Sequence, residues 1–138
     1  MLYASDAVVE RIEALQFSLG GGQCFEAFNT GRPVLVPDLA AASGAAWPVF
    51  ASHTVDEPIG AIFAFPLHRG AARVGAIDMY RRSPGWLSLG ELATALQVAD
   101  IATTALLGLR VIGTTAGLTR SGSPQCPIIG NRCIRPPV

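Results

Sequence analysis

Two neighbouring apolar segments constrain the fold of this chain more than any other feature. They read IGAIFAFPL and VGAIDMY, and the connection HRGAAR lies between them. Segments rich in aromatic and β-branched residues predict strands, and a short connection with a glycine predicts a turn, so we expect an antiparallel hairpin. Side chains of a strand point alternately to opposite faces, so Phe63 and Phe65 should share one face, as should Ile77 and Met79. The same alternation puts Asp78 on a face that we expect to meet solvent.

A long helix is predicted to follow the hairpin. In the segment GWLSLGEL, Ser88 and Glu91 stand three residues apart, the spacing of a capping box that starts a helix. Apolar residues then recur at steps of three and four, in the series Leu89, Leu92, Leu96, Ala99, Thr103 and Leu106. One side of this helix is expected to pack on the sheet. Residues 88–109 are equally a candidate homodimer interface, because the apolar surface is widened by Val98, Ile101 and Ala105.

The N-terminal part predicts two helices, a short strand and a helical turn. In DAVVERIEALQFSL, Asp6 is a suitable N-cap, and apolar residues follow at helical spacing, namely Val8, Ile12, Leu15 and Leu19. The three glycines at 20–22 end this helix. QCFEAFNT is predicted to form a second helix that ends at Gly31, PVLVPDL a strand, and WPVFASH a helical turn.

Composition excludes several classes of protein. The chain has 138 residues, enough for one ordinary domain, and 14% of them are charged, with a formal net charge of zero. All ten basic residues are arginine, so neither a Schiff-base nor a P-loop lysine exists, and no basic field favours direct binding of nucleic acid. Arg110 interrupts the apolar segment 101–118, so we expect no membrane span. Three cysteines and no recognisable secretion signal predict a reducing, cytoplasmic location.

The run LGGGQC at residues 19–24 raises the question of catalysis. Phe25 stands where a dinucleotide-binding fingerprint needs its third glycine, and a predicted helix rather than a strand precedes the run. Cys24 lies near the start of a predicted helix, where a thiol is either activated or simply packed, and no pattern places a histidine beside it. Cys126 and Cys133 lack a zinc-site spacing, and the carboxylates form no acid–base or metal pattern. We therefore predict no catalytic residue, no metal and no cofactor.

The order of these segments resembles a known family. LQFSLGGGQCFEAFNTGRPVLVPDL, then WPVFA, then the hairpin and the helix of GWLSLGELATALQVADIATTALL are similar to the GAF domains of bacterial GAF–ANTAR regulators. The resemblance runs from about Ser5 to Leu107. It implies an α+β fold of GAF or PAS type, in which helices flank an antiparallel sheet. It also implies a module that senses small ligands or redox state, or that dimerises.

The resemblance implies where a ligand would bind. The pocket would lie between the sheet and the short helix that carries Cys24. Together with the predicted strand faces, this gives a set of candidate ligand-binding residues, which are Cys24, Phe25, Phe28, Phe63, Phe65, Ile77 and Met79. Plain packing in the hydrophobic core accounts for the same residues and is the simpler interpretation.

Departures from the family pattern predict an incomplete domain. Residues 1–109 are expected to form a truncated GAF domain that lacks the first helix and a central strand. Residues 110–138 contain four arginines, no acidic residue and much Gly, Pro, Ser and Thr, which predicts a disordered or unrelated tail. Nothing in this tail resembles the ANTAR module, which leads to the hypothesis that the chain is a gene remnant.

The function expected from these observations is non-catalytic. The chain is predicted to be a cytoplasmic sensory or dimerisation domain of a bacterial signalling or transcription-regulatory protein, with a small-molecule ligand of unknown identity. One alternative is a thiol enzyme similar to the free methionine sulfoxide reductases, with Cys24 as its nucleophile. Another is an antitermination factor that acts through a partner bearing an ANTAR module.

Overall fold

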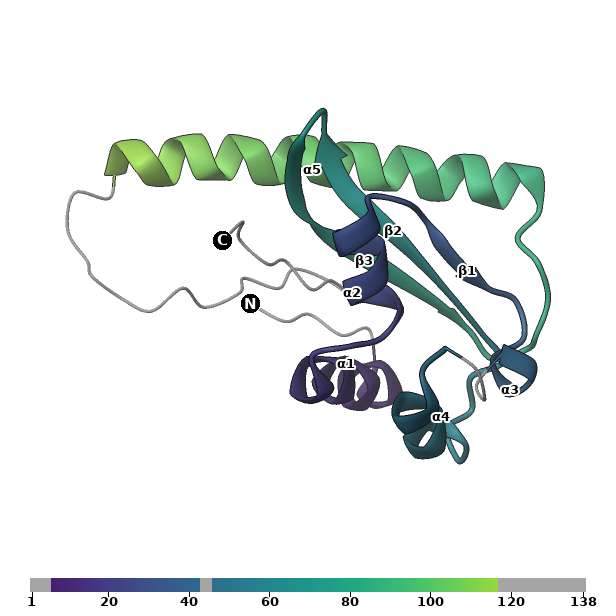
Figure 1. Cartoon of the computed structure of the whole chain (residues 1–138). Coiled ribbons are helices and arrows are strands. Elements are labelled where there is room, and N and C mark those ends of the chain that lie inside the picture. Colours follow the sequence, from purple (N-terminus) through teal and green to yellow (C-terminus); the bar gives the residue numbers. More distant parts are fainter. Residues whose placement is uncertain (1–5, 43–45, 117–138) are drawn as a thin grey trace.

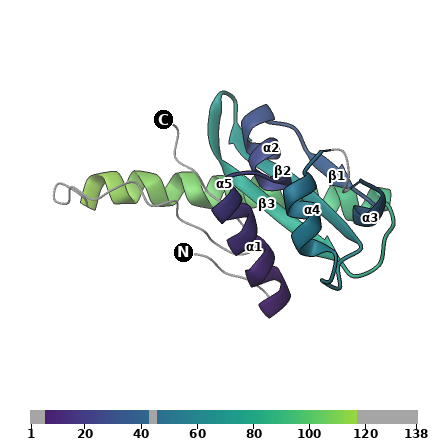
Figure 2. The same ribbon diagram turned by 60° about the horizontal axis from the view of Figure 1, so that its bottom comes forward.

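The computed structural model describes residues 6–42 and 46–116. In this part of the chain, three antiparallel strands form one sheet in the order β1–β2–β3, with bounds Val34–Val36, Ala61–Arg69 and Ala72–Arg81. The helices are α1 (Ala7–Leu19), α2 (Gln23–Thr30), α3 (Leu39–Ala42), α4 (Pro48–Thr54) and α5 (Leu89–Ala116). Helix α5 crosses one face of the sheet, while α1, α2 and α4 lie on the opposite side (Figures 1 and 2). The predicted α+β class with an antiparallel sheet between helices is confirmed, and three strands agree with an incomplete sheet.

The predicted hairpin is formed by β2 and β3. Phe63 is paired with Met79 and Phe65 with Ile77, so the register brings these four side chains to one face. Gly70 makes the turn with φ of 57°, a left-handed conformation that glycine adopts without strain. The predicted sharing of faces within each strand is therefore correct.

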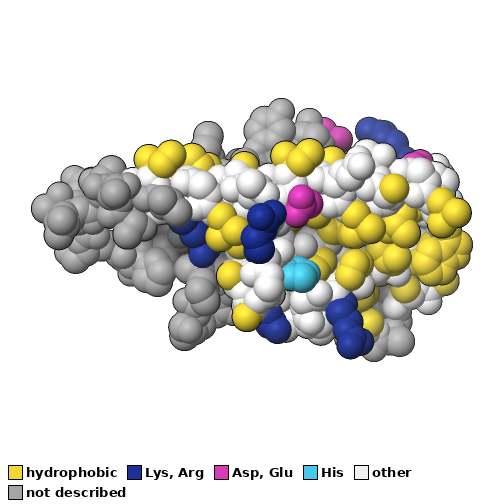
Figure 3. Space-filling model, turned by 90° about the horizontal axis from the view of Figure 1, so that it is seen from above, with side chains coloured by type: hydrophobic (Ala, Val, Ile, Leu, Met, Phe, Trp, Pro, Cys, Tyr) yellow, Lys and Arg dark blue, Asp and Glu magenta, His cyan; other side chains and the backbone are white. Residues whose placement is uncertain are grey.

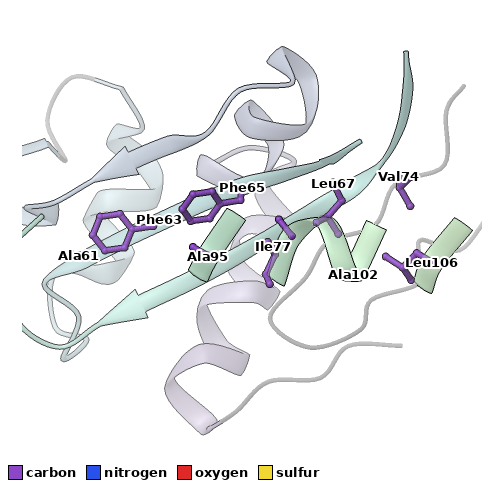
Figure 4. Close-up of a cluster of buried hydrophobic side chains, with 10 residues drawn as sticks. Ala61, Phe63, Phe65, Leu67, Val74, Ile77, Ala95, Ala102 and Leu106 are labelled. Atoms are coloured by element: carbon purple, nitrogen blue, oxygen red, sulfur yellow. The ribbon is translucent and has the colours of Figure 1, made fainter. Parts of the chain in front are cut away.

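The face that carries the two phenylalanines packs on α5. Figure 4 shows Phe63, Phe65 and Leu67 of β2 directed toward Ala95 and Ala102 of α5. The phenylalanines are at most 1% exposed. Small side chains on the helix facing large ones on the sheet allow close packing without voids. This layer is the larger part of the hydrophobic core.

Helix α5 begins as predicted but runs further. The Ser88 N–H donates to Oε2 of Glu91 at 2.7 Å, and the Glu91 N–H donates to Oγ of Ser88 at 3.2 Å, which confirms the capping box. The helix passes through the predicted boundary at residue 110 and ends at Ala116, beyond the sheet (Figure 1). The rest of the predicted tail, with Cys126 and Cys133, lies outside the described residues.

The predicted apolar seam of α5 is partly wrong. Leu89 is 88% exposed and Leu96 is 48% exposed, whereas Ala95 and Ala102 are buried against the sheet. The seam was predicted from steps of three and four residues, but close contact with the phenylalanines of β2 selects small side chains at Ala95 and Ala102. Ala99, Thr103 and Leu106 are buried as expected.

The opposite face of the sheet is covered by α2 and α1. Small Ala64 and Ala76 lie under α2, next to Cys24. Helix α1 is the predicted helix, and both backbone N–H groups of Val8 and Val9 donate to the Asp6 carboxylate at 3.0 Å. Its buried side was predicted in part: Ile12 is buried and Val8 and Leu15 pack against the core, but Leu19 is 41% exposed, and Val9, Glu13 and Gln16 are buried as well.

Candidate functional site

The glycines between α1 and α2 allow the two helices to meet at a sharp angle. Gly20 caps the end of α1 with φ of 59°, and Gly22 precedes α2 with φ of 123°. A Cβ atom on Gly22 would lie 2.5 Å from Oε1 of Gln16, closer than any side chain tolerates. The glycine run therefore allows the turn between the helices and the close approach of Gln16. Its geometry does not indicate a phosphate-binding loop.

Gln16 joins three elements. Its Oε1 accepts a hydrogen bond from the backbone N–H of Cys24 in α2 at 3.2 Å. Its Nε2 donates to Oδ2 of Asp78 at 2.8 Å and to the hydroxyl of Tyr80 at 3.2 Å, both in β3. Gln16 is 1% exposed, so these bonds are made away from solvent. One side chain thus fixes α1 to the sheet and to the start of α2.

Two carboxyl groups meet at Tyr80. The hydroxyl oxygen of Tyr80 lies 2.6 Å from Oε1 of Glu13 and 3.2 Å from Oδ2 of Asp78. Glu13 is 2% exposed and Asp78 is 1% exposed. We call Glu13, Gln16, Asp78 and Tyr80 the polar cluster. The expectation that Asp78 meets solvent is wrong, because α1 covers the face of β3 opposite α5.

Burial dominates the electrostatics of the polar cluster. It raises the pKa of the Glu13 carboxyl, and the hydrogen bond with Tyr80 opposes this only in part. The pKa of Tyr80 is raised well above its usual value, first by burial and then by the neighbouring Asp78 and Glu13 carboxyls. The phenol therefore stays protonated near neutral pH, and burial shifts the equilibrium of Glu13 toward its neutral form.

Gln23 adds an amide that has no partner. It is the first residue of α2 and is completely buried, with 0% exposure. Neither Nε2 nor Oε1 of Gln23 forms a hydrogen bond within the part of the chain that the structure describes. A buried polar group without a partner costs about 1–3 kcal/mol, so this amide is suited to binding something that supplies a donor and an acceptor.

The structure divides the seven predicted site residues between two faces of the sheet. Cys24 lies on the α2 face, with Phe25 and Phe28 packed beside it. The other four lie on the α5 face, where they belong to or contact the core, and they are Phe63, Phe65, Ile77 and Met79. A single pocket lined by all seven is not formed, because the sheet separates the two groups. Sequence alternation grouped the four correctly but did not identify the helix that covers them.

The structure places the candidate nucleophile and one of the two histidines outside any metal-binding cluster of described residues. Cys24 is buried, and its side chain is 1% exposed. His53 is exposed and contacts the carbonyl oxygen of Val49 on its own helix at 2.8 Å. Within residues 6–42 and 46–116, no three histidine, cysteine or acidic side chains gather where they would hold a metal ion.

A small surface pocket opens beside the polar cluster. Its volume is about 120 Å³, and its lining consists of Asp6, Val8, Val9, Pro58, Ile59, Tyr80, Arg81 and Arg82. Tyr80 belongs to both this pocket and the polar cluster. The tyrosine therefore connects solvent with the buried polar groups beneath α1.

Helix α5 exposes apolar side chains on its outer side. Figure 3 shows hydrophobic side chains along this face, with charged side chains among them. Ile101, Leu109 and Ile112 are between 57% and 67% exposed. Residues Leu89–Arg110 have the length and apolar composition of a membrane-spanning helix, which is weak evidence because core helices meet the same criteria.

Comparison with known proteins identifies the domain type. The family model of the GAF domain matches residues 3–106. A solved domain assigned to a two-component sensor histidine kinase from Sinorhizobium meliloti 1021 is 20% identical with a TM-score of 0.55, and the match covers 62% of this chain and 58% of that one. The type II free methionine-R-sulfoxide reductase from Thermoplasma acidophilum is 19% identical with a TM-score of 0.48, covering 64% of this chain and 57% of that one.

These likenesses show the fold alone. The chain spans less than two thirds of the length of either solved structure. No curated protein matches it.

Proposed function

This chain belongs to the GAF domain family, and we propose that it is a non-catalytic sensory domain of a cytoplasmic bacterial signalling protein, which binds a small ligand beneath helix α1. The observation that carries this proposal is the fully buried, unpartnered amide of Gln23 at the start of α2. A sensory role is also what the resemblance to GAF–ANTAR regulators implies.

Burial of so many polar groups on α1, the start of α2 and β3 is unusual for a purely structural core. Glu13, Gln16, Gln23 and Asp78 are each at most 2% exposed, and the first three come from α1 and α2. An apolar core of the same shape would avoid their desolvation cost. Groups of this kind are retained where they position a ligand or change state with it.

The burial of Cys24 supports a non-catalytic role over thiol chemistry. A nucleophilic thiol must reach its substrate, and Cys24 is 1% exposed, with its backbone N–H bonded to Gln16. The reductase alternative therefore predicts turnover of free methionine sulfoxide that disappears in Cys24→Ser. The sensory proposal predicts no turnover in either protein.

Native mass spectrometry tests ligand binding directly. The whole chain is purified from a bacterial host under mild conditions and compared with Gln23→Met, which keeps the size of the side chain but removes its donor and acceptor. Gln97→Met is the matched control, because Gln97 is exposed on α5. We expect a bound small molecule on the wild type and the control but not on Gln23→Met. Equal binding by all three variants, or none in the wild type even with a metabolite library, would contradict the proposal.

We further propose that the domain forms a homodimer through α5. The exposed Ile101, Leu109 and Ile112 support it, since they lie on a side of the helix that does not contact the sheet. Such a surface favours association because it removes apolar area from water.

A further inference from the structure

The polar cluster has more hydrogen-bond contacts than available protons when both of its carboxyl groups are ionised. Glu13 and Asp78 both contact the hydroxyl of Tyr80, at 2.6 and 3.2 Å. A hydroxyl has one proton, and an ionised carboxylate has none. If both acids are ionised, Tyr80 donates to one of them, and the contact with the other brings two acceptor oxygens together without a proton.

One additional proton completes every contact. If Glu13 is protonated, it donates to the hydroxyl oxygen of Tyr80, and Tyr80 donates its own proton to Oδ2 of Asp78. The two protons of Gln16 Nε2 go to Asp78 and to the hydroxyl, at 2.8 and 3.2 Å. The hydroxyl oxygen then accepts two bonds and donates one, which is its full capacity. Asp78 is the member that remains ionised.

The charged groups around the cluster do not replace this proton. Glu13 of α1 faces Asp78 and Tyr80, which both belong to β3, and the buried thiol of Cys24 lies on α2. The arginines adjacent in sequence are engaged elsewhere, because Arg11 pairs with Glu57 at 2.7 Å and Arg81 pairs with Glu91. Asp6 and Arg82 line the surface pocket that Tyr80 also lines. Among the described residues, no arginine forms an ion pair with Glu13.

We propose that Glu13 carries a proton at neutral pH and that loss of this proton releases α1 from β3, so that the docking of α1 is a proton-dependent switch. Ionised Glu13 would be a second buried negative charge beside Asp78. The two carboxylates would then compete for the single hydroxyl proton of Tyr80. Because Gln16 also binds the Cys24 N–H, release of α1 removes one bond from the start of α2. The effect of this switch on a ligand rests on the proposed function, because it acts on the site that we propose for the ligand.

The direction of the pH effect follows from linkage. Burial raises the pKa of Glu13 in the docked state above the ordinary glutamate value. Docking is therefore fully favourable below that ordinary value and weakens as pH rises from it toward the raised one. Over this interval the ratio of docked to undocked α1 falls about tenfold for each pH unit.

Hydrogen exchange of the α1 backbone measures docking without a ligand. Protection factors, which correct for the intrinsic pH dependence of exchange, are measured on the whole chain for wild type, Glu13→Gln and Glu10→Gln. Glutamine at position 13 retains a donor for Tyr80 but cannot ionise, whereas Glu10 is exposed on the same helix and serves as the control. We expect protection of α1 in the wild type and in Glu10→Gln to fall as pH rises above the ordinary glutamate value, by up to about tenfold for each pH unit. Glu13→Gln should remain protected throughout.

Carbon-13 NMR of the Glu13 carboxyl in the wild type gives a second result that needs no variant. A neutral carboxyl at pH 7 is expected, and an ionised one would overturn the proposal. The same pH dependence in Glu13→Gln as in the wild type would also overturn it, as would failure of Glu13→Gln to fold, since the neutral amide reproduces the proposed state. None of these results depends on ligand binding, so failure of the switch is distinguishable from failure of the sensory function.

Discussion

Gly22 and Gln16 are in such close contact that no side chain at position 22 would fit beside the glutamine amide without displacing it. A Cβ at position 22 would lie 2.5 Å from Oε1 of Gln16, and the φ of Gly22 is 123°. The run of glycines that precedes Cys24 is thereby explained by the position of one side chain, which connects α1, α2 and β3.

Gly22→Ala is predicted to destabilise the protein. The new methyl group must displace Gln16, and the alanine must adopt an unfavourable backbone conformation. Together these effects should lower the free energy of unfolding by about 1–3 kcal/mol. Gly21→Ala is the control, because its Cβ would meet nothing closer than the Leu19 carbonyl oxygen at 4.0 Å. Urea titration followed by circular dichroism measures both. Equal stability of the two variants would argue against the proposed packing of Gln16.

The core between the sheet and α5 is predicted to depend on Phe65. It is 0% exposed, and truncation to alanine leaves a cavity, so Phe65→Ala should reduce the free energy of unfolding by about 3–5 kcal/mol. Phe17→Ala, at a position 56% exposed, should change it by less than about 0.5 kcal/mol. Chemical denaturation of both proteins checks the difference. Similar losses for the two would mean that the α5 face is not the main core.

The capping box is predicted to stabilise the start of α5. Ser88→Ala removes the side-chain acceptor of the Glu91 N–H and should cost about 1 kcal/mol. Ser83→Ala, at an exposed position before the helix, is expected to be near neutral. Thermal melts and amide exchange of the first turn distinguish the two variants. If the exchange of this turn is unchanged in Ser88→Ala, the hydrogen bond contributes nothing.

A charge on the outer side of α5 is predicted to prevent dimerisation. Ile101 is 67% exposed in the monomer, and a glutamate there would be buried without a partner in the dimer. Sedimentation equilibrium should show a dimer for the wild type and for Ala93→Glu, at an exposed position elsewhere on the helix, and a monomer for Ile101→Glu. A monomeric wild type, or association with lipid vesicles instead, would reject the dimer.

Local patterns were sufficient to predict the individual elements. The capping residues of α1 and α5, the glycine turn of the hairpin and the shared face of Phe63 and Phe65 all depend on residues close in sequence. Which helix covers which face depends on long-range packing instead. The prediction placed Phe63 and Phe65 against the helix of Cys24, whereas they pack on α5.

The polar cluster was not predicted because its members are ordinarily surface residues. Asp78 was expected to meet solvent, but both acids are buried, because Glu13 of α1 bonds to Tyr80 of β3 and Asp78 of β3 bonds to Gln16 of α1. The bond between Gln16 and Asp78 joins residues 62 positions apart, and no local pattern reports such a contact. A helical stripe at positions 9, 12, 13 and 16 was the available signal, but its two polar members concealed it.

NMR of the Gln23 side-chain amide tests the central claim most directly. Nitrogen-15 spectra of the whole chain are recorded before and after addition of a low-molecular-weight extract of the host cells, with the resonances assigned from Gln23→Met and Gln97→Met. We predict that the NH₂ signals of Gln23 move on addition, because its buried amide gains partners, while those of exposed Gln97 stay in place. Unchanged Gln23 signals, with shifts confined to surface residues, would contradict a ligand site beneath helix α1.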